Sequence, residues 1–137
     1  MPVISNRKEY LMDTKKTVLL VDDDVDLLDQ TRLVVEKEYA VDVAYSGDEA
    51  LKKVAGKTYD CIVMDVMMES LSDGLDTAKK IKADEATRSV PVIMLTSVNE
   101  HYDYSSQVDT NYFPNDKWLN KPVKPEVLVA EIRKLIG

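Results

Sequence analysis

Short apolar runs alternate along this chain with segments whose apolar residues recur at helical spacing. Residues 17–22, 60–65 and 91–96 are runs rich in Val, Leu and Ile with polar residues at their ends. Such runs predict strands that are buried on both faces of a parallel sheet. Residues 40–44 alternate, with Asp42 opposite to Val41 and Val43, and predict an edge strand. Residues 117–120 predict a short fifth strand.

Helices are predicted between these strands. One apolar helical face is formed by Leu27, Leu28, Thr31, Val34 and Val35. Ser46 and Glu49 have the spacing of a capping box and predict a short helix that stops at Gly56. Apolar positions at 75, 78 and 81 predict a further helix, and those from 128 to 136 predict the last one. Weaker patterns suggest short helices near residues 7–12 and 100–108.

Five strands that alternate with about five helices define an α/β domain, a doubly wound five-stranded parallel sheet with helices on both faces. A chain of 137 residues suffices for one such domain but not for two. Residues 1–16 are polar and mixed in charge, so we expect an N-terminal extension there and a single domain over residues 17–137.

The bulk properties exclude several classes of partner. The formal net charge is −7, whereas binding to nucleic acid or to an anionic membrane needs a positive surface. No apolar stretch reaches the ~20 residues of a membrane span, and residues 1–16 lack the apolar core of a secretory signal. The single cysteine, Cys61, lies in a predicted strand and fits a reducing compartment, so we expect a cytoplasmic protein.

Carboxylates follow two of the predicted strands. Asp22 and Asp23 end the first strand, and Asp65 ends the third. Ligands of open parallel sheets bind at the carboxyl ends of the strands, so these three side chains are expected in one pocket. Such a pocket suits a hard divalent cation, and one of its carboxylates could act as a nucleophile. Asp24 is instead interpreted as the N-cap of the first helix.

Residues 17–137 resemble the receiver domain of two-component response regulators. The resemblance rests on five short pieces in the family's order: Val21-Asp22-Asp23, Asp65, Asp73-Gly74, Thr96-Ser97 and Lys121-Pro122. It implies a flavodoxin-like sheet with strand order 2-1-3-4-5. It also implies a phosphorylation-controlled switch that receives a phosphoryl group from a sensor histidine kinase or a phosphotransfer protein and acts on a downstream protein partner or effector domain.

The resemblance also implies roles for single residues. Asp65 would be the phosphoacceptor, and Mg²⁺ would be held by Asp22, Asp23, Asp65 and the backbone carbonyl of Met67. Thr96 would donate its hydroxyl to a phosphoryl oxygen. Such a domain catalyses only its own phosphoryl transfer and dephosphorylation, so an enzyme acting on another substrate is not expected.

Two further roles follow from the same resemblance. Lys121 would pair with the phosphoryl group, and the Lys121–Pro122 peptide bond would be cis. Trp118 would be the aromatic switch residue that responds to Thr96.

The sequence departs from the family pattern in the loop after the third strand. Glu69 stands where proline is common, and the stretch before Gly74 is one residue longer than usual, so Glu69 could reach the metal through water or be a solvated loop acid. Met67 occupies the position where phosphatases with an aspartyl-phosphate intermediate usually carry a second aspartate, which counts against that class of enzyme.

Two more classes of protein fit the sequence less well. A nucleotide-binding flavodoxin-like module would need a Gly-rich phosphate loop, and the chain has only four glycines. A receiver that no longer accepts phosphate would not be expected to retain the full set of acids with Thr96 and Lys121. The sequence is compatible both with a stand-alone receiver and with part of a larger regulator.

Overall fold

The computed structural model describes residues 15–66, 68, 73–97 and 117–137. Five strands lie within these ranges: β1 (Thr17–Val21), β2 (Ala40–Ala44), β3 (Cys61–Asp65), β4 (Val92–Ser97) and β5 (Lys117–Lys121). The helices of the same ranges are α2 (Val25–Val35), α3 (Gly47–Gly56), α4 (Asp73–Ala83) and α6 (Pro125–Ile136). The suggested helices near residues 7–12 and 100–108 lie outside the described residues.

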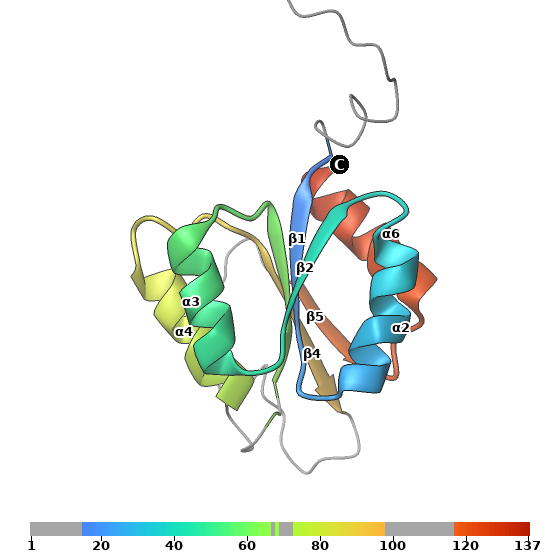
Figure 1. Cartoon of the computed structure of the whole chain (residues 1–137), viewed down its shortest axis with the longest axis horizontal. Helices are drawn as coiled ribbons and strands as arrows, with labels where there is room; N and C mark the ends of the chain where they lie inside the picture. Colours follow the sequence, from blue (N-terminus) through green and yellow to red (C-terminus); the bar gives the residue numbers. More distant parts are fainter. Residues whose placement is uncertain (1–14, 67, 69–72, 98–116) are drawn as a thin grey trace, which may run out of the picture.

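The strands form one parallel sheet in the order β2-β1-β3-β4-β5. The predicted doubly wound α/β fold is confirmed, because α3 and α4 cover one face of this sheet and α2 and α6 cover the other (Figure 1). All five strands run in the same direction, so their carboxyl ends lie together at the lower edge in Figure 1. β2 is an edge strand, as its alternating sequence predicts.

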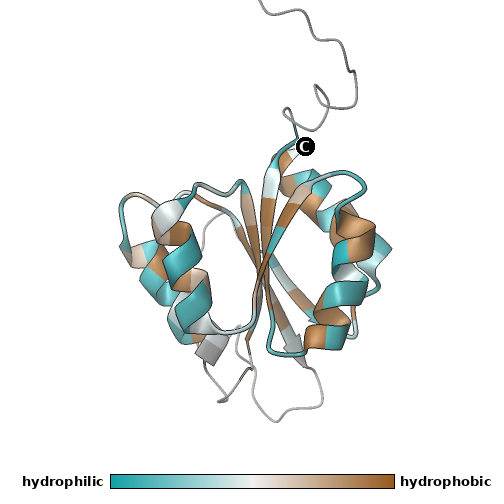
Figure 2. Ribbon diagram, in the orientation of Figure 1, coloured by the Kyte–Doolittle hydropathy of each residue, from teal (hydrophilic) through white to brown (hydrophobic). Residues whose placement is uncertain are grey.

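Alternate residues of the central strands supply two separate cores. Leu20 and Val63 pack with α2 and α6, whereas Leu19 and Met64 pack with α3 and α4. Side chains of a strand point alternately to its two faces, so a strand buried on both faces has a continuous apolar sequence. Figure 2 shows the result as hydrophobic strands between helices whose outer faces are hydrophilic.

Side chains cap the first turns of two helices. Asp24 accepts a hydrogen bond from the backbone N–H of Leu27 at 3.1 Å, which confirms its predicted role as the N-cap of α2. Ser46 accepts one from the N–H of Glu49 at 3.1 Å, as the capping-box pattern predicts. The carboxylate of Glu49 bonds to the N–H of Tyr45, one residue earlier than in a standard capping box.

The structure corrects one prediction about packing. Helical spacing predicts Leu27 on the buried face of its helix with Leu28, but Leu27 is 41% exposed while Leu28 is 4% exposed. Leu27 lies in the first turn of α2 and lines a cavity that is partly open to solvent, so its neighbours do not cover it completely.

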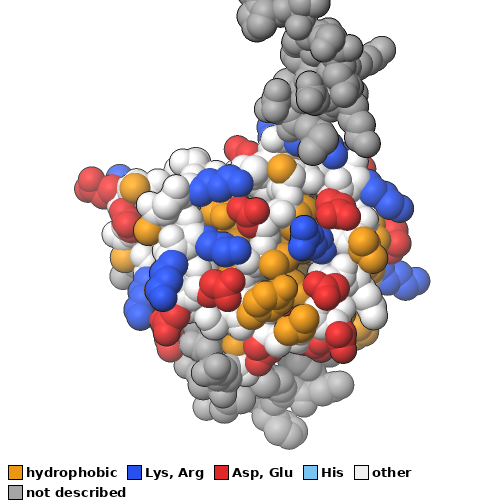
Figure 3. All heavy atoms as spheres, viewed as in Figure 1, with side chains coloured by type: hydrophobic (Ala, Val, Ile, Leu, Met, Phe, Trp, Pro, Cys, Tyr) orange, Lys and Arg blue, Asp and Glu red, His pale blue; other side chains and the backbone are white. Residues whose placement is uncertain are grey.

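Charged side chains of both signs are interspersed over the surface seen in Figure 3. Several of them pair, as in the contact of Lys57 with Asp42 at 3.1 Å and that of Arg32 with Glu36 at 3.4 Å. Within the described ranges, every helix is too short or too polar to cross a bilayer.

Candidate functional site

Two buried carboxylates and one ammonium group meet at the carboxyl edge of the sheet. Asp22 follows β1, Asp65 ends β3 and Lys121 ends β5. Each lies two positions after a residue packed in or against the core beneath α2 and α6: Leu20, Val63 and Leu119, respectively. Strand alternation therefore directs the three side chains to the same face of the sheet.

Asp22 is held in place by the turn that leads into α2. Its backbone N–H donates to the carbonyl of Ala44 at 3.1 Å, which extends the pairing with β2 by one residue. Its carboxylate accepts from the N–H of Asp24 at 3.0 Å, a local Asx turn. Asp22 is only 4% exposed, whereas the next residue, Asp23, is exposed.

Lys121 connects the two buried acids. Its Nζ lies 2.9 Å from Asp65 Oδ2 and 3.5 Å from Asp22 Oδ2. The Lys121–Pro122 peptide bond is cis, which confirms the expectation drawn from the resemblance. Asp65 and Lys121 are 56 residues apart in sequence, so the sheet alone brings them into contact.

The electrostatics of the site show that its negative charge is only partly compensated. Burial raises the pKa of Asp65 from its ordinary value of 3.8 to about 6, against the hydrogen bond from Lys121 and with a further contribution from the charge of Asp22. Burial by itself would lower the pKa of Lys121, but the hydrogen bond and the charge of Asp65, with those of Asp22, leave it raised. Among the described residues of the site, three carboxylates face one ammonium group.

This donor set fits a divalent cation. One carboxylate oxygen from each of Asp22, Asp23 and Asp65 lies within 4.8 Å of the others. Carboxylate oxygens are the ligands preferred by Mg²⁺ and Ca²⁺, and Mg²⁺ is usually held by one or two carboxylates with water completing its shell. The acidic cluster that the sequence predicts is therefore present. Met67 and Glu69, also considered as contributors, lie outside the described residues.

Thr96 and Trp118 lie on the strands next to the acids. Leu95 is the register partner of Asp65, so Thr96 is one residue beyond it on β4. Trp118 is the register partner of Met94 and packs, partly buried, against the core beneath α3 and α4. Met94 and Thr96 are two positions apart on one strand, so Thr96 and Trp118 belong to the same face of the sheet.

Gly74 allows α4 to approach the end of β3. A Cβ atom at Gly74 would lie 1.7 Å from the carbonyl oxygen of Asp65 and 2.9 Å from the Cα of Val66. The N–H of Gly74 donates to the carbonyl of Val66 at 2.9 Å. The Asp73-Gly74 piece singled out in the sequence thus has a steric reason, because only a residue without a side chain fits against this backbone.

Comparisons with known proteins identify the family of this chain. A family model for the response regulator receiver domain matches residues 18–133. The chain therefore belongs to the response regulator receiver domains, the phosphoacceptor signalling switches of two-component systems.

Relatives of this chain include transcriptional regulators and a chemotaxis protein. The transcriptional regulatory protein ResD of Bacillus subtilis is 33% identical over 120 residues, which are 87% of this chain and 47% of ResD. The response regulator ArlR of Staphylococcus saprophyticus is 32% identical over 87% of this chain and 51% of its own length. The chain thus spans about half the length of these curated relatives.

A solved structure of similar size is the chemotaxis protein CheY4 of Vibrio cholerae, with a TM-score of 0.76 and 27% identity. The alignment covers 89% of this chain and 99% of CheY4.

Proposed function

We propose that Asp65 accepts a phosphoryl group from the phosphohistidine of a sensor histidine kinase or a phosphotransfer protein. The observation that carries this proposal is the convergence of Asp22, Asp23 and Asp65 with Lys121 at the carboxyl edge of the sheet. Phosphoryl transfer needs mainly positioning and charge neutralisation, and these four side chains offer both.

Asp22, Asp23 and Asp65 would hold Mg²⁺, with the carbonyl of Met67 as a further ligand implied by the family. When bound, the ion supplies positive charge for carboxylate and phosphoryl oxygens together. The three carboxylates within 4.8 Å support this role, because a bound cation would relieve their mutual repulsion.

In the transfer step, one oxygen of the ionised Asp65 carboxylate bonds to phosphorus as the bond from phosphorus to the donor's imidazole nitrogen breaks. The electron pair of that bond stays on the imidazole nitrogen, which can then take up a proton from water. Lys121 is already hydrogen-bonded to Asp65, and its ammonium group can also donate a hydrogen bond to a phosphoryl oxygen as negative charge develops there. Thr96 would donate its hydroxyl to another phosphoryl oxygen.

The output would be read by protein partners or an effector domain. Thr96 would move toward the phosphoryl group, and Trp118 would turn inward in response. Their common face on adjacent strands supports this coupling. The net charge of −7 favours protein partners over direct contact with nucleic acid or membrane, and the single cysteine favours the cytoplasm. No reaction on another substrate is proposed.

Intact-mass measurement after incubation with acetyl phosphate and Mg²⁺ tests this function. We expect one added phosphoryl group on the wild-type chain and none on Asp65→Asn. Asp29→Asn is the matched control, because it removes one exposed carboxylate from α2, away from the acidic cluster. Labelling of Asp65→Asn equal to the wild type would move the acceptor elsewhere. A wild-type chain that stays unlabelled while a known receiver is labelled would favour an interaction module that does not use phosphate.

A further inference from the structure

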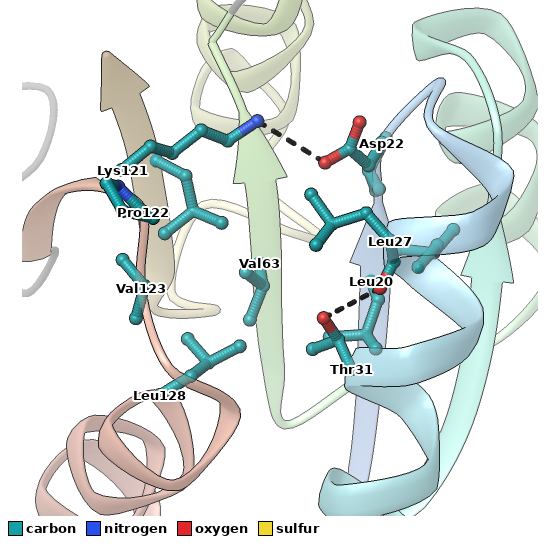
Figure 4. A pocket seen from close by; sticks show the side chains of 12 residues that line it. Leu20, Asp22, Leu27, Thr31, Val63, Lys121, Pro122, Val123 and Leu128 are labelled. Carbon is teal, nitrogen blue, oxygen red and sulfur yellow. Dashed lines mark hydrogen bonds and ion pairs between the residues drawn. The ribbon is translucent and has the colours of Figure 1, made fainter.

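A cavity of about 330 Å³ lies directly beside the acidic site, between the sheet and the first turns of α2 and α6 (Figure 4). Its walls are formed largely by aliphatic side chains, among them Leu27, Leu28, Val63, Val123 and Leu128. The cavity is partly open to solvent, and it explains why Leu27 remains 41% exposed although it points toward apolar neighbours. Ligand sites are commonly concave, mostly apolar and of this size.

The polar groups of the cavity are concentrated at one end. The ion pair of Lys121 and Asp22 spans that end, while Leu128 lies at the other (Figure 4). Thr31 lines the wall, and its hydroxyl donates to the backbone carbonyl of Leu27 at 2.9 Å. A molecule seated here would have an apolar body against the aliphatic wall and its polar group toward Asp22 and Lys121.

The charge at this end selects the sign of that polar group. Within the described part of the chain, Asp22, Asp23 and Asp65 set three carboxylates against the single ammonium group of Lys121. Each carboxylate oxygen accepts more than one hydrogen bond, so Asp22 can bind a second donor while it retains Lys121 and the N–H of Asp24. A carboxylate head group would be repelled, whereas an ammonium group would be attracted.

We propose that this cavity binds a small primary amine with an apolar body, whose ammonium group bonds to Asp22. At about 30 Å³ for each water-sized group, the cavity holds about ten non-hydrogen atoms. The ammonium group would neutralise a carboxylate that also belongs to the divalent-cation set, so amine and Mg²⁺ weaken each other's binding reciprocally. That the amine thereby slows phosphorylation of Asp65 rests on the proposed function, but amine binding itself does not.

Three probes of similar size and different charge test the proposal: phenethylamine, phenethyl alcohol and phenylacetate. Their binding to the metal-free chain is measured by two-dimensional NMR of the backbone amides. We expect phenethylamine to shift amides of residues that line the cavity and to bind about tenfold more tightly than the alcohol, with phenylacetate weakest. Added Mg²⁺ is expected to raise the apparent dissociation constant of the amine.

Two variants of α2 form a matched pair for this experiment. Thr31→Leu fills the cavity with a larger side chain and is expected to weaken phenethylamine binding about tenfold. Leu33→Ala changes a residue of the same helix that is 63% exposed and does not line the cavity, so the affinity should stay as in the wild type. Asp22→Asn should abolish the preference for the amine over the alcohol.

Several results would overturn the proposal. They are the absence of amide shifts at millimolar phenethylamine, equal or tighter binding of phenylacetate, and unchanged affinity in Thr31→Leu. The proposed function is judged separately by labelling of Asp65 with no amine present, so failure of the amine site would leave labelling intact.

Discussion

Replacement of Asp65 by Asn is expected to stabilise the metal-free domain at neutral pH. Asp65 is 4% exposed, and the pKa of its carboxyl group is raised from 3.8 to about 6, chiefly by burial. The folded state therefore holds this group's proton more tightly than the unfolded state does. Since Asn resembles the protonated carboxyl in shape and carries no charge, the variant removes the unfavourable ionised form while Lys121 keeps its contact with Asp22 at 3.5 Å.

The magnitude follows from the shift in pKa. A rise of about two units at about 1.4 kcal/mol for each unit corresponds to about 2–3 kcal/mol of stability lost when Asp65 ionises in the folded state. This value already includes the favourable bond from Lys121. The free energy of unfolding of Asp65→Asn should thus exceed that of the wild type by about 2–3 kcal/mol at neutral pH.

The pH dependence has a definite sign. An acid whose pKa is higher in the folded state than in the unfolded state makes no difference to stability below its unfolded pKa, near 3.8, and lowers stability as pH rises toward about 6. The advantage of the Asn variant should therefore be small near pH 4, grow across this window and remain constant above it. Mg²⁺ should reduce the advantage at neutral pH, because it stabilises the wild-type folded state by binding.

Urea unfolding followed by circular dichroism, with a chelator and at several pH values between about 4 and 7, measures the difference. Asp29→Asn is the control for the loss of one negative charge, and its effect should stay within about 0.5 kcal/mol at every pH. If Asp65→Asn is less stable than the wild type at pH 7, or if the difference in their free energies of unfolding does not change with pH, burial of the ionised Asp65 carboxylate does not destabilise the folded state and the reasoning is refuted.

Three further predictions concern the surroundings of the site. Gly74→Ala should lower stability by about 1–3 kcal/mol and slow labelling by acetyl phosphate, because its Cβ would lie 1.7 Å from the backbone carbonyl oxygen of Asp65. Urea unfolding and labelling rates test this prediction, and wild-type values for both would contradict it. Asp24→Ala should lower the free energy of unfolding by about 1 kcal/mol, because it removes the helix cap, whereas Asp23→Ala should weaken Mg²⁺ binding more than Asp24→Ala does. Urea unfolding measures the first effect and titration calorimetry the second; weaker Mg²⁺ binding in Asp24→Ala than in Asp23→Ala would contradict these assignments. Beryllofluoride with Mg²⁺ should change the fluorescence of Trp118 in the wild type but less in Thr96→Ala; an unchanged wild-type spectrum at saturation would exclude Trp118 as the switch residue.

The local pattern of the chain is sufficient to predict the fold and to identify the acids. Period-two and helical spacing depend on residues close in sequence, so the amino-acid sequence alone places the strands and most helix ends. The cap at Asp24 is likewise a local interaction between side chain and backbone. Because parallel strands present their carboxyl ends together, Asp22 and Asp65 are expected at one edge from their positions at the ends of two apolar runs.

Tertiary structure decided the properties that arise from contacts distant in sequence. Lys121 reaches Asp22 across 99 residues, and the depth at which the sheet and its helices bury Asp65 determines the pKa of that acid. The close approach of Gly74 in α4 to the backbone of Asp65, and the cavity beside Leu27, depend on how the helices pack against the sheet. Helical spacing assigned Leu27 to a buried face, but burial requires a neighbour that fills the space, and only the packed molecule reveals whether one is present.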